Sequence, residues 1–222
     1  PISVVNNNSY LKNASPESVF SAAMMAATLD LPVNSNLGFA YLVPYGSACQ
    51  FQLGWRGYVQ LALRSGQFKT ISACPVYEGQ LVENNPLTGF KFDFNNKKSD
   101  VIIGFASYFS LINGYEKTLY MSTEEVNAHG KRFSKTFGTG VWKSDYNSMA
   151  QKTVLKLLLS RFAPMSIEMQ KAVIADQAVI KDAETMDVEY VDAGQDLTEA
   201  KEKASQNATA RIEKLKASTN EA

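Results

Sequence analysis

The fold is decided by residues 101–121, VIIGFASYFSLINGYEKTLYM. Val101–Ile112 is a long apolar run that is typical of a strand, and Asn113-Gly114 is a dipeptide that favours a tight hairpin turn. Glu116–Met121 then supplies the returning strand. The centre of the chain is therefore predicted to be an antiparallel sheet.

More strands are expected on the amino-terminal side of this hairpin. Phe39–Val43 and Cys49–Leu53 are strand-like, and the turn-rich segment Pro44–Ser47 between them predicts a second hairpin. Phe68–Tyr77 is predicted to be a further strand. The strict alternation of Phe90–Phe94 is typical of a half-buried strand.

Helices are expected before, between and after these strands. Ser15 is a favourable N-cap with Pro16 at the first helical position, and Ser122–Glu125 forms a capping box. Helices are predicted over residues 16–29, 55–64, 144–162 and 166–181, with another beginning after Ser122. The sequence therefore predicts an α+β fold in which a small antiparallel β-sheet packs on helices.

The composition divides the chain into two regions. Residues 1–181 are predicted to form the core, and residues 182–222 an acidic linker followed by an Ala/Glu/Lys-rich tail. The bulky apolar residues of the tail are Leu197, Ile212 and Leu215, too few for a core of its own. We expect the tail to be a solvent-facing helix or disordered.

The charges are unevenly distributed although 22 basic and 22 acidic residues give a net charge of zero. Residues 1–163 carry 15 basic and 10 acidic residues, whereas residues 164–222 carry 7 and 12. Within residues 129–163, seven basic residues accompany one acid, Asp145. A basic block beside an acidic tail is typical of nucleic-acid binders. A solvated surface with a soluble tail fits the charges equally well.

Several classes of protein are disfavoured. No run approaches 18 uncharged apolar residues, so no membrane span is expected, and no secretory signal is visible. Cys49 and Cys74 are too few for a disulfide framework and fit a reducing cytoplasm. His129, the single histidine, disfavours a His-based metal site. No P-loop motif is present, so ATP binding is not expected.

A first candidate site lies in residues 50–69. Proteins that bind single strands need a cationic groove for the phosphates and planar groups for the bases, and this segment interleaves both. Gly54 and Gly57 are expected to let a phosphate backbone approach closely, whereas Trp55 fits a core anchor better. The candidate contacts are Gln52, Arg56, Tyr58, Arg64 and Lys69.

A second candidate site lies in residues 131–161. Lys152 and Lys156 are four residues apart and share one face of the predicted helix. Arg161 lies about half a turn away on an ideal helix, which suits a partner subunit or a buried ion pair. The candidate contacts are Lys131, Arg132, Lys135, Trp142, Lys143, Lys152, Lys156 and Arg161.

The order of these motifs closely resembles the RecT family of phage single-strand annealing proteins (recombinases), which is similar to the superfamily of the phage λ β protein. The resemblance is collinear over about residues 1–180, and the tail after Asp182 does not share it. It is carried by Ala27–Pro32, Asn36–Tyr45, Gln50–Lys69, Trp142-Lys143, Met149–Lys156 and Ser166–Ala172.

The resemblance implies a protein that binds single-stranded DNA and anneals complementary strands without ATP. It implies an oligomer, a ring or a helical filament, that coats the annealed duplex intermediate in the cytoplasm of a bacterial host. It also implies a phage exonuclease and the host single-strand binding protein as partners, no membrane, and no required cofactor, with Mg²⁺ only as a DNA counterion. Trp142, Lys152 and Arg161 correspond to a Trp, a Lys and an Arg of the late helix in the λ β superfamily.

Two alternatives to an annealing protein remain. Asp93, Asp100 and Glu116 would suit a metal-dependent nuclease if they converged, although their flanking turns favour solvated loop acids. The chain would instead be a structural oligomer if the basic block served protein contacts. No catalytic motif supports an enzyme.

Overall fold

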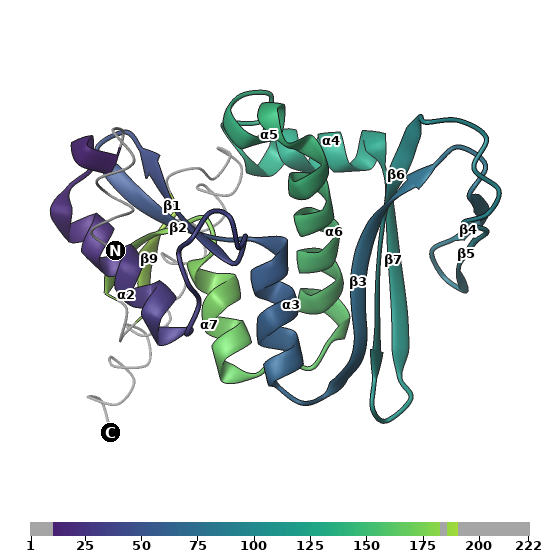
Figure 1. Cartoon of the computed structure of the whole chain (residues 1–222), viewed down its shortest axis with the longest axis horizontal. Helices are drawn as coiled ribbons and strands as arrows, with labels where there is room; N and C mark the ends of the chain where they lie inside the picture. Colours follow the sequence, from purple (N-terminus) through teal and green to yellow (C-terminus); the bar gives the residue numbers. More distant parts are fainter. Residues whose placement is uncertain (1–10, 183–185, 191–222) are drawn as a thin grey trace, which may run out of the picture.

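The computed structural model describes residues 11–182 and 186–190. Helices and small antiparallel sheets make up an α+β fold (Figure 1), as predicted. A three-stranded sheet forms one end, and a β-hairpin with a covering helix forms the other. Three helices, α3, α6 and α7, lie between the two ends.

The central sheet has the strand order β3-β6-β7. It consists of β3 (Phe68–Tyr77), β6 (Ile102–Leu111) and β7 (Glu116–Ser122). The predicted hairpin joins β6 to β7, and Gly114 takes the positive φ of +88° that such a turn requires. At the edge of the sheet, Pro75 of β3 pairs with Phe105 of β6.

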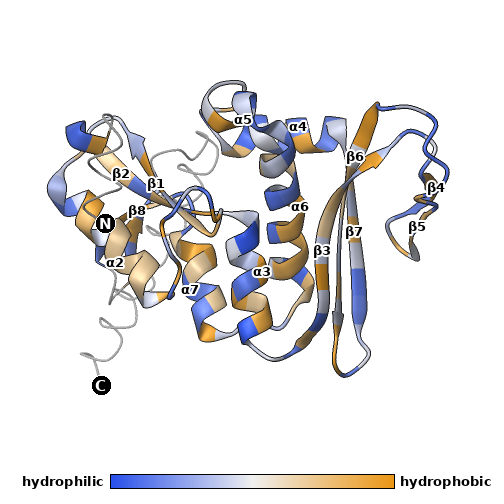
Figure 2. Cartoon of the chain, in the orientation of Figure 1, coloured by the Kyte–Doolittle hydropathy of each residue, from blue (hydrophilic) through white to orange (hydrophobic). Residues whose placement is uncertain are grey.

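Helix α6 (Tyr146–Phe162) packs on this sheet. Asp145 caps it by accepting a hydrogen bond from the Ser148 N–H group. Leu155 and Leu158 of α6 are fully buried in the same core cluster as Phe109 of β6. Figure 2 shows hydrophobic residues in the turns of α6 that lie beside β3. Burial of these side chains holds the helix against the sheet.

A second group of elements surrounds the other hairpin. β1 (Ala40–Tyr45) pairs with β2 (Ala48–Leu53), and α2 (Pro16–Thr28) packs against β2. The short helix η1 (Leu11–Asn13) precedes α2. Ser15 caps α2 by accepting from the Ser18 N–H group, as expected from the Ser-Pro-Glu start.

The remaining helices link the two ends. α3 (Trp55–Arg64) contacts α6, β3 and α7 (Ile167–Ala175). α4 (Thr123–Phe133) begins with the predicted capping box, and the short α5 (Gly140–Ser144) precedes α6. One buried cluster runs from α2 and β2 through α3 to α6 and β6, so it joins both ends.

The outer face of the sheet carries a further hairpin. β4 (Leu81–Asn85) pairs with β5 (Gly89–Phe92), and β5 contacts β7. Phe90 and Phe92 pack against the buried Tyr120. The strand predicted over Phe90–Phe94 is β5, which ends at Phe92, two residues earlier than expected.

The predicted helix over residues 166–181 is wrong in its second half. α7 ends at Ala175, and Gln177 takes a positive φ of 65°. The chain then forms β8 (Val179–Asp182), which pairs with β9 (Asp187–Glu189). Backbone hydrogen bonds between Phe51 of β2 and residues 177 and 178 favour this extended path over a longer helix. The predicted boundary at 181/182 thus lies within β8, and residues 197–216 of the tail lie outside the described residues.

Gly54 and Gly57 serve packing, which corrects their expected role beside a phosphate backbone. Both are buried. A Cβ atom on Gly54 would lie 2.0 Å from the carbonyl oxygen of Gly38, and one on Gly57 would lie 2.2 Å from that of Phe39. The two glycines therefore let α3 approach the backbone before β1.

Gly57→Ala is expected to destabilise the protein by about 1–3 kcal/mol or more, because the obstructing atom is backbone and cannot rotate away. The measurement is the urea denaturation midpoint. Gln60→Ala, at an exposed position of the same helix, is the matched control and should leave the midpoint almost unchanged. Equal midpoints for Gly57→Ala and the unsubstituted chain would contradict the packing role.

Candidate nucleic-acid interface

Two cavities lie on either side of Lys152. The hairpin pocket, about 390 Å³, lies between the β1–β2 hairpin with the start of α3 and the start of α6, and its lining includes Tyr41, Gln52, Trp55, Arg56, Asp145 and Lys152. The helix pocket, about 320 Å³, lies among α4, α6 and the end of α7, and its lining includes His129, Phe133, Trp142, Lys152, Lys156 and Asp176. Met149 and Lys152 line both pockets.

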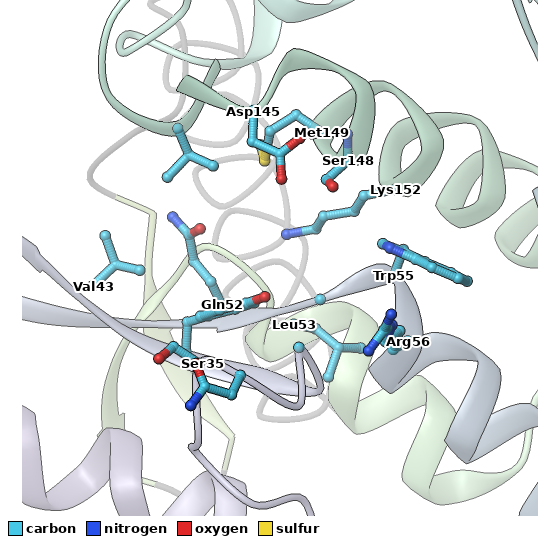
Figure 3. A pocket seen from close by; sticks show the side chains of 15 residues that line it. Ser35, Val43, Gln52, Leu53, Trp55, Arg56, Asp145, Ser148, Met149 and Lys152 are labelled. Atoms are coloured by element: carbon cyan, nitrogen blue, oxygen red, sulfur yellow. Dashed lines mark hydrogen bonds between the residues drawn. The ribbon is translucent and has the colours of Figure 1, made fainter. Parts of the chain in front are cut away.

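The hairpin pocket combines cations with a planar ring. Lys152 points from α6 into this pocket, while Trp55 and Arg56 lie beside each other at the start of α3 (Figure 3). The Arg56 guanidinium carbon is 5.7 Å from the centroid of the Trp55 ring. The pocket also holds one acid, Asp145. Burial, followed by the charge of Asp145, raises the pKa of Tyr41, and Arg56 opposes that rise.

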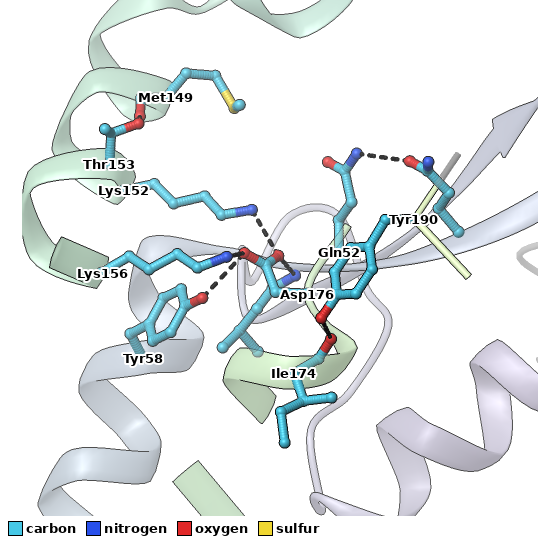
Figure 4. A network of polar contacts seen from close by, with 11 residues as sticks. Gln52, Tyr58, Met149, Lys152, Thr153, Lys156, Ile174, Asp176 and Tyr190 are labelled. Carbon is cyan, nitrogen blue, oxygen red and sulfur yellow. Dashed lines mark hydrogen bonds and ion pairs between the residues drawn. The ribbon is translucent and has the colours of Figure 1, made fainter. Parts of the chain in front are cut away.

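A buried carboxylate organises the lysines of α6. Asp176 directly follows α7 and accepts from the Lys152 ammonium at 2.8 Å and the Lys156 ammonium at 2.7 Å (Figure 4). It also accepts from the Tyr58 hydroxyl at 3.0 Å and from the Leu53 N–H group at 2.9 Å. Four donors from β2, α3 and α6 therefore converge on one side chain.

The network leaves an excess of positive charge. Burial alone would raise the pKa of the Asp176 carboxyl, but the ammonium groups of Lys152 and Lys156 hold that pKa well below its usual range. Burial, together with the charge and hydrogen bond of Asp176, raises the pKa of Tyr58. One carboxylate thus balances two ammonium groups, and the Lys156 side chain is 28% exposed.

The helix pocket adds further cations and aromatic rings. The rings of His129 and Phe133 lie 4.4 Å apart. Burial, then the charges of Lys156, Arg161 and Arg132, lower the pKa of His129 to about 4, so the imidazole is neutral at pH 7.

The structure brings together only part of the predicted contact set. Among the predicted contacts, Gln52, Arg56 and Lys152 line the hairpin pocket. Trp142, Lys152 and Lys156 line the helix pocket. Arg132 and Arg161 are exposed and act electrostatically on His129. Four further candidates are exposed and do not line either pocket, namely Lys69, Lys131, Lys135 and Lys143.

Three predicted contacts have structural roles. Tyr58 is fully buried beneath Asp176, so its side chain has no surface for a ligand. Lys152 is 6% exposed and paired with Asp176. Arg64 donates to the carbonyl oxygen of Leu29 at 2.5 Å and so caps the end of α2. The burial of Tyr58 corrects its predicted contact with DNA, whereas the contacts of Lys152, which lines both pockets, and of the partly exposed Arg64 stay predictions.

Arg161 does not form the buried ion pair that its position on the helix suggested. Its side chain is exposed, and no acid pairs with it among the described residues. Because Arg161 and Lys156 both act on His129, the end of α6 gathers positive charge beside the helix pocket.

The acids of the nuclease alternative do not converge. Asp100 pairs with Lys97 at 2.6 Å, Glu116 accepts from a tyrosine hydroxyl at 2.7 Å, and Asp93 accepts from a backbone N–H group of its own turn at 3.0 Å. Within residues 11–182 and 186–190, no group of three or more His, Cys, Asp or Glu side chains is placed to hold a metal ion.

Sequence reasoning missed Asp176, the centre of the polar network. The available signal was a single acid in the apolar run Ala172–Ile180. A charge in such a run is buried only with a partner, and Lys152 and Lys156 on one helix face were the obvious candidates.

The fold and the site define a small α+β protein with two adjoining pockets that carry cations and aromatic rings. The particular family follows from comparison with known sequences. The chain belongs to the RecT family, because the model of that family matches residues 2–190.

Two known proteins are similar to this chain. The chain is 52% identical over 177 residues to the uncharacterized protein YqaK of Bacillus subtilis (strain 168), a match that covers 79% of this chain and 61% of that protein. It is 30% identical over 186 residues to Protein RecT of Escherichia coli (strain K12), covering 75% of this chain and 65% of that protein. The chain thus spans less than two thirds of the length of either relative. No helix in the described part of the chain is long and apolar enough to cross a membrane.

Proposed function

We propose that this chain binds single-stranded DNA and anneals complementary strands during homologous recombination, without ATP and as an oligomer. The observation that supports this most directly is the pairing of cations with aromatic rings in two adjoining pockets of a RecT family member. Such a surface has the two components that bind a single strand, positive charge for phosphates and planar faces for bases.

The cations at the two pockets, the exposed Arg56 and the partly exposed Lys156, support a mechanism of annealing. Arg56 at the hairpin pocket and Lys156 at the helix pocket would hold phosphates, which carry no sequence information. The pairing edges of the bases would remain free for a second strand. Neutralised phosphates would also lower the repulsion between the two incoming strands.

Membership of the RecT family also supports a proposal for the assembly and its partners. We propose a ring or a helical filament that coats the annealed duplex intermediate in the bacterial cytoplasm. A phage exonuclease would supply single strands, and the host single-strand binding protein would hold them beforehand. No cofactor would be required, and Mg²⁺ would serve only as a DNA counterion.

The decisive test is an annealing assay without ATP. The protein is mixed with one fluorescent oligonucleotide, and then either its labelled complement or an unrelated strand is added. We expect energy transfer to rise much faster than without protein, and only with the complement. Binding without faster transfer would contradict annealing.

A salt series separates DNA binding from a purely structural oligomer. Phosphate contacts to a single strand make the logarithm of the binding constant fall with the logarithm of salt concentration by about 0.7 per contact. A binding constant that salt leaves unchanged would contradict the proposed phosphate contacts.

A further inference from the structure

Two aromatic side chains in the helix pocket have ring nitrogens without a hydrogen-bond partner among the described residues. The indole N–H group of Trp142 is buried and finds no acceptor within the part of the chain that the structure describes. The imidazole of His129 has a ring contact with Phe133 but no hydrogen bond to any described residue. A buried donor without an acceptor is costly and rare in folded proteins. Both side chains line the same cavity, so an acceptor bound there would satisfy them.

The charges around His129 point to an anionic acceptor. The charges of Arg132 on its own helix α4 and of Lys156 and Arg161 on α6 act on the imidazole. Lys152 of α6 lines the same cavity. The other titratable groups that line the pocket are Asp176, which both lysines already engage, and Tyr190. Two lysines therefore line a cavity that holds one carboxylate, and the charges of Arg132 and Arg161 add to the positive potential at His129.

From this arrangement we propose that the helix pocket binds one phosphate group of the DNA strand and that His129 takes up a proton when it does. The inference rests on the proposed function, since the phosphate belongs to the bound DNA. The proton comes from solvent and adds to the free imidazole nitrogen. The resulting imidazolium donates to a phosphate oxygen, and the Trp142 N–H group donates to another.

The proton linkage follows from the electrostatics of the empty and filled pocket. Without an anion, burial and the neighbouring cations hold the pKa of His129 at about 4. A phosphate would neutralise those cations and place a negative charge beside the ring, which favours the protonated form. Because the pKa is then higher in the complex than in the free protein, DNA affinity rises as the pH falls through the pKa of the complex toward 4.

The single histidine makes this linkage directly measurable. The imidazole resonance of the 222-residue chain is followed by NMR against pH, without DNA and with a short oligothymidylate. We expect a pKa of about 4 in the free protein and a value close to the ordinary histidine pKa of about 6.5 in the complex. A pKa that DNA leaves unchanged would overturn the inference.

A matched variant tests the effect of the proton on affinity. DNA binding is measured at about pH 7 and pH 5 for the unsubstituted chain and for His129→Gln, which keeps a polar side chain but cannot titrate. Affinity of the unsubstituted chain should rise on the order of tenfold more than that of His129→Gln. Equal rises would overturn the inference and leave the proposed function standing. Absence of DNA binding at both pH values would overturn both, because no phosphate would reach the pocket.

Discussion

Asp176→Ala is expected to lower the free energy of unfolding by about 3–5 kcal/mol. The substitution leaves the ammonium group of Lys152, whose side chain is 7% exposed, without its counter-charge. The Leu53 N–H group and the Tyr58 hydroxyl lose their acceptor as well. Urea denaturation followed by tryptophan fluorescence measures the loss.

An exposed ion pair supplies the control for this substitution. Asp100→Ala removes the contact with Lys97 at the surface, where solvent already screens the charges. It should barely change the denaturation midpoint. If Asp176→Ala and Asp100→Ala shifted the midpoint equally, the buried network would not contribute the stability that we assign to it.

The same substitution is expected to change acid stability. Lys152 and Lys156 hold the pKa of Asp176 below its unfolded value of 3.8, against the effect of burial. A carboxyl group with a lowered pKa stabilises the folded state above its unfolded pKa and loses that contribution as the pH falls further. Between about pH 4 and pH 2, the unsubstituted chain should therefore lose more stability than Asp176→Ala does.

Arg56→Glu is expected to weaken single-strand binding by at least about tenfold and to lower the salt dependence. Arg56 is exposed, lines the hairpin pocket and forms no ion pair with the described residues. Its replacement removes one phosphate contact, about 0.7 in the log–log salt slope, and adds a repulsive charge. Fluorescence anisotropy with an oligothymidylate at several salt concentrations gives both quantities.

Lys98→Glu is the matched control, because it makes the same charge change at an exposed position outside both pockets. It should leave affinity close to that of the unsubstituted chain. Equal losses in the two variants would show that total charge, rather than the hairpin pocket, determines binding. Lys152→Ala is a poorer test because it also removes a partner of the buried Asp176.

Local signals predicted most of the fold. The helix at Trp55–Arg64 and the strand at Phe68–Tyr77 have the predicted bounds, since each begins and ends at a local turn or cap. The end of α7 was not predictable in this way. The helix ends where the following residues form hydrogen bonds with Phe51, more than a hundred positions earlier in the chain. No local sequence pattern predicts such a distant contact.

The candidate site was harder to predict than the fold. Residue type and spacing identified Arg56 and Lys156, which the structure places at the two pockets. The same criteria also selected Tyr58, which is fully buried. Tyr58 is buried because β2, α3, α6 and the end of α7 converge around it. The residue type alone therefore does not predict whether a basic or aromatic side chain reaches solvent.

The proline in β3 limits how copies of this chain can associate. Strand β3 is at the edge of its sheet, and an edge strand with free N–H and C=O groups can recruit a strand from another molecule. Pro75, the eighth of the ten residues of β3, has no N–H group to offer, so it weakens the ladder that such strand addition would build near that end of the strand. One residue therefore disfavours growth of an assembly by strand addition at this end of β3.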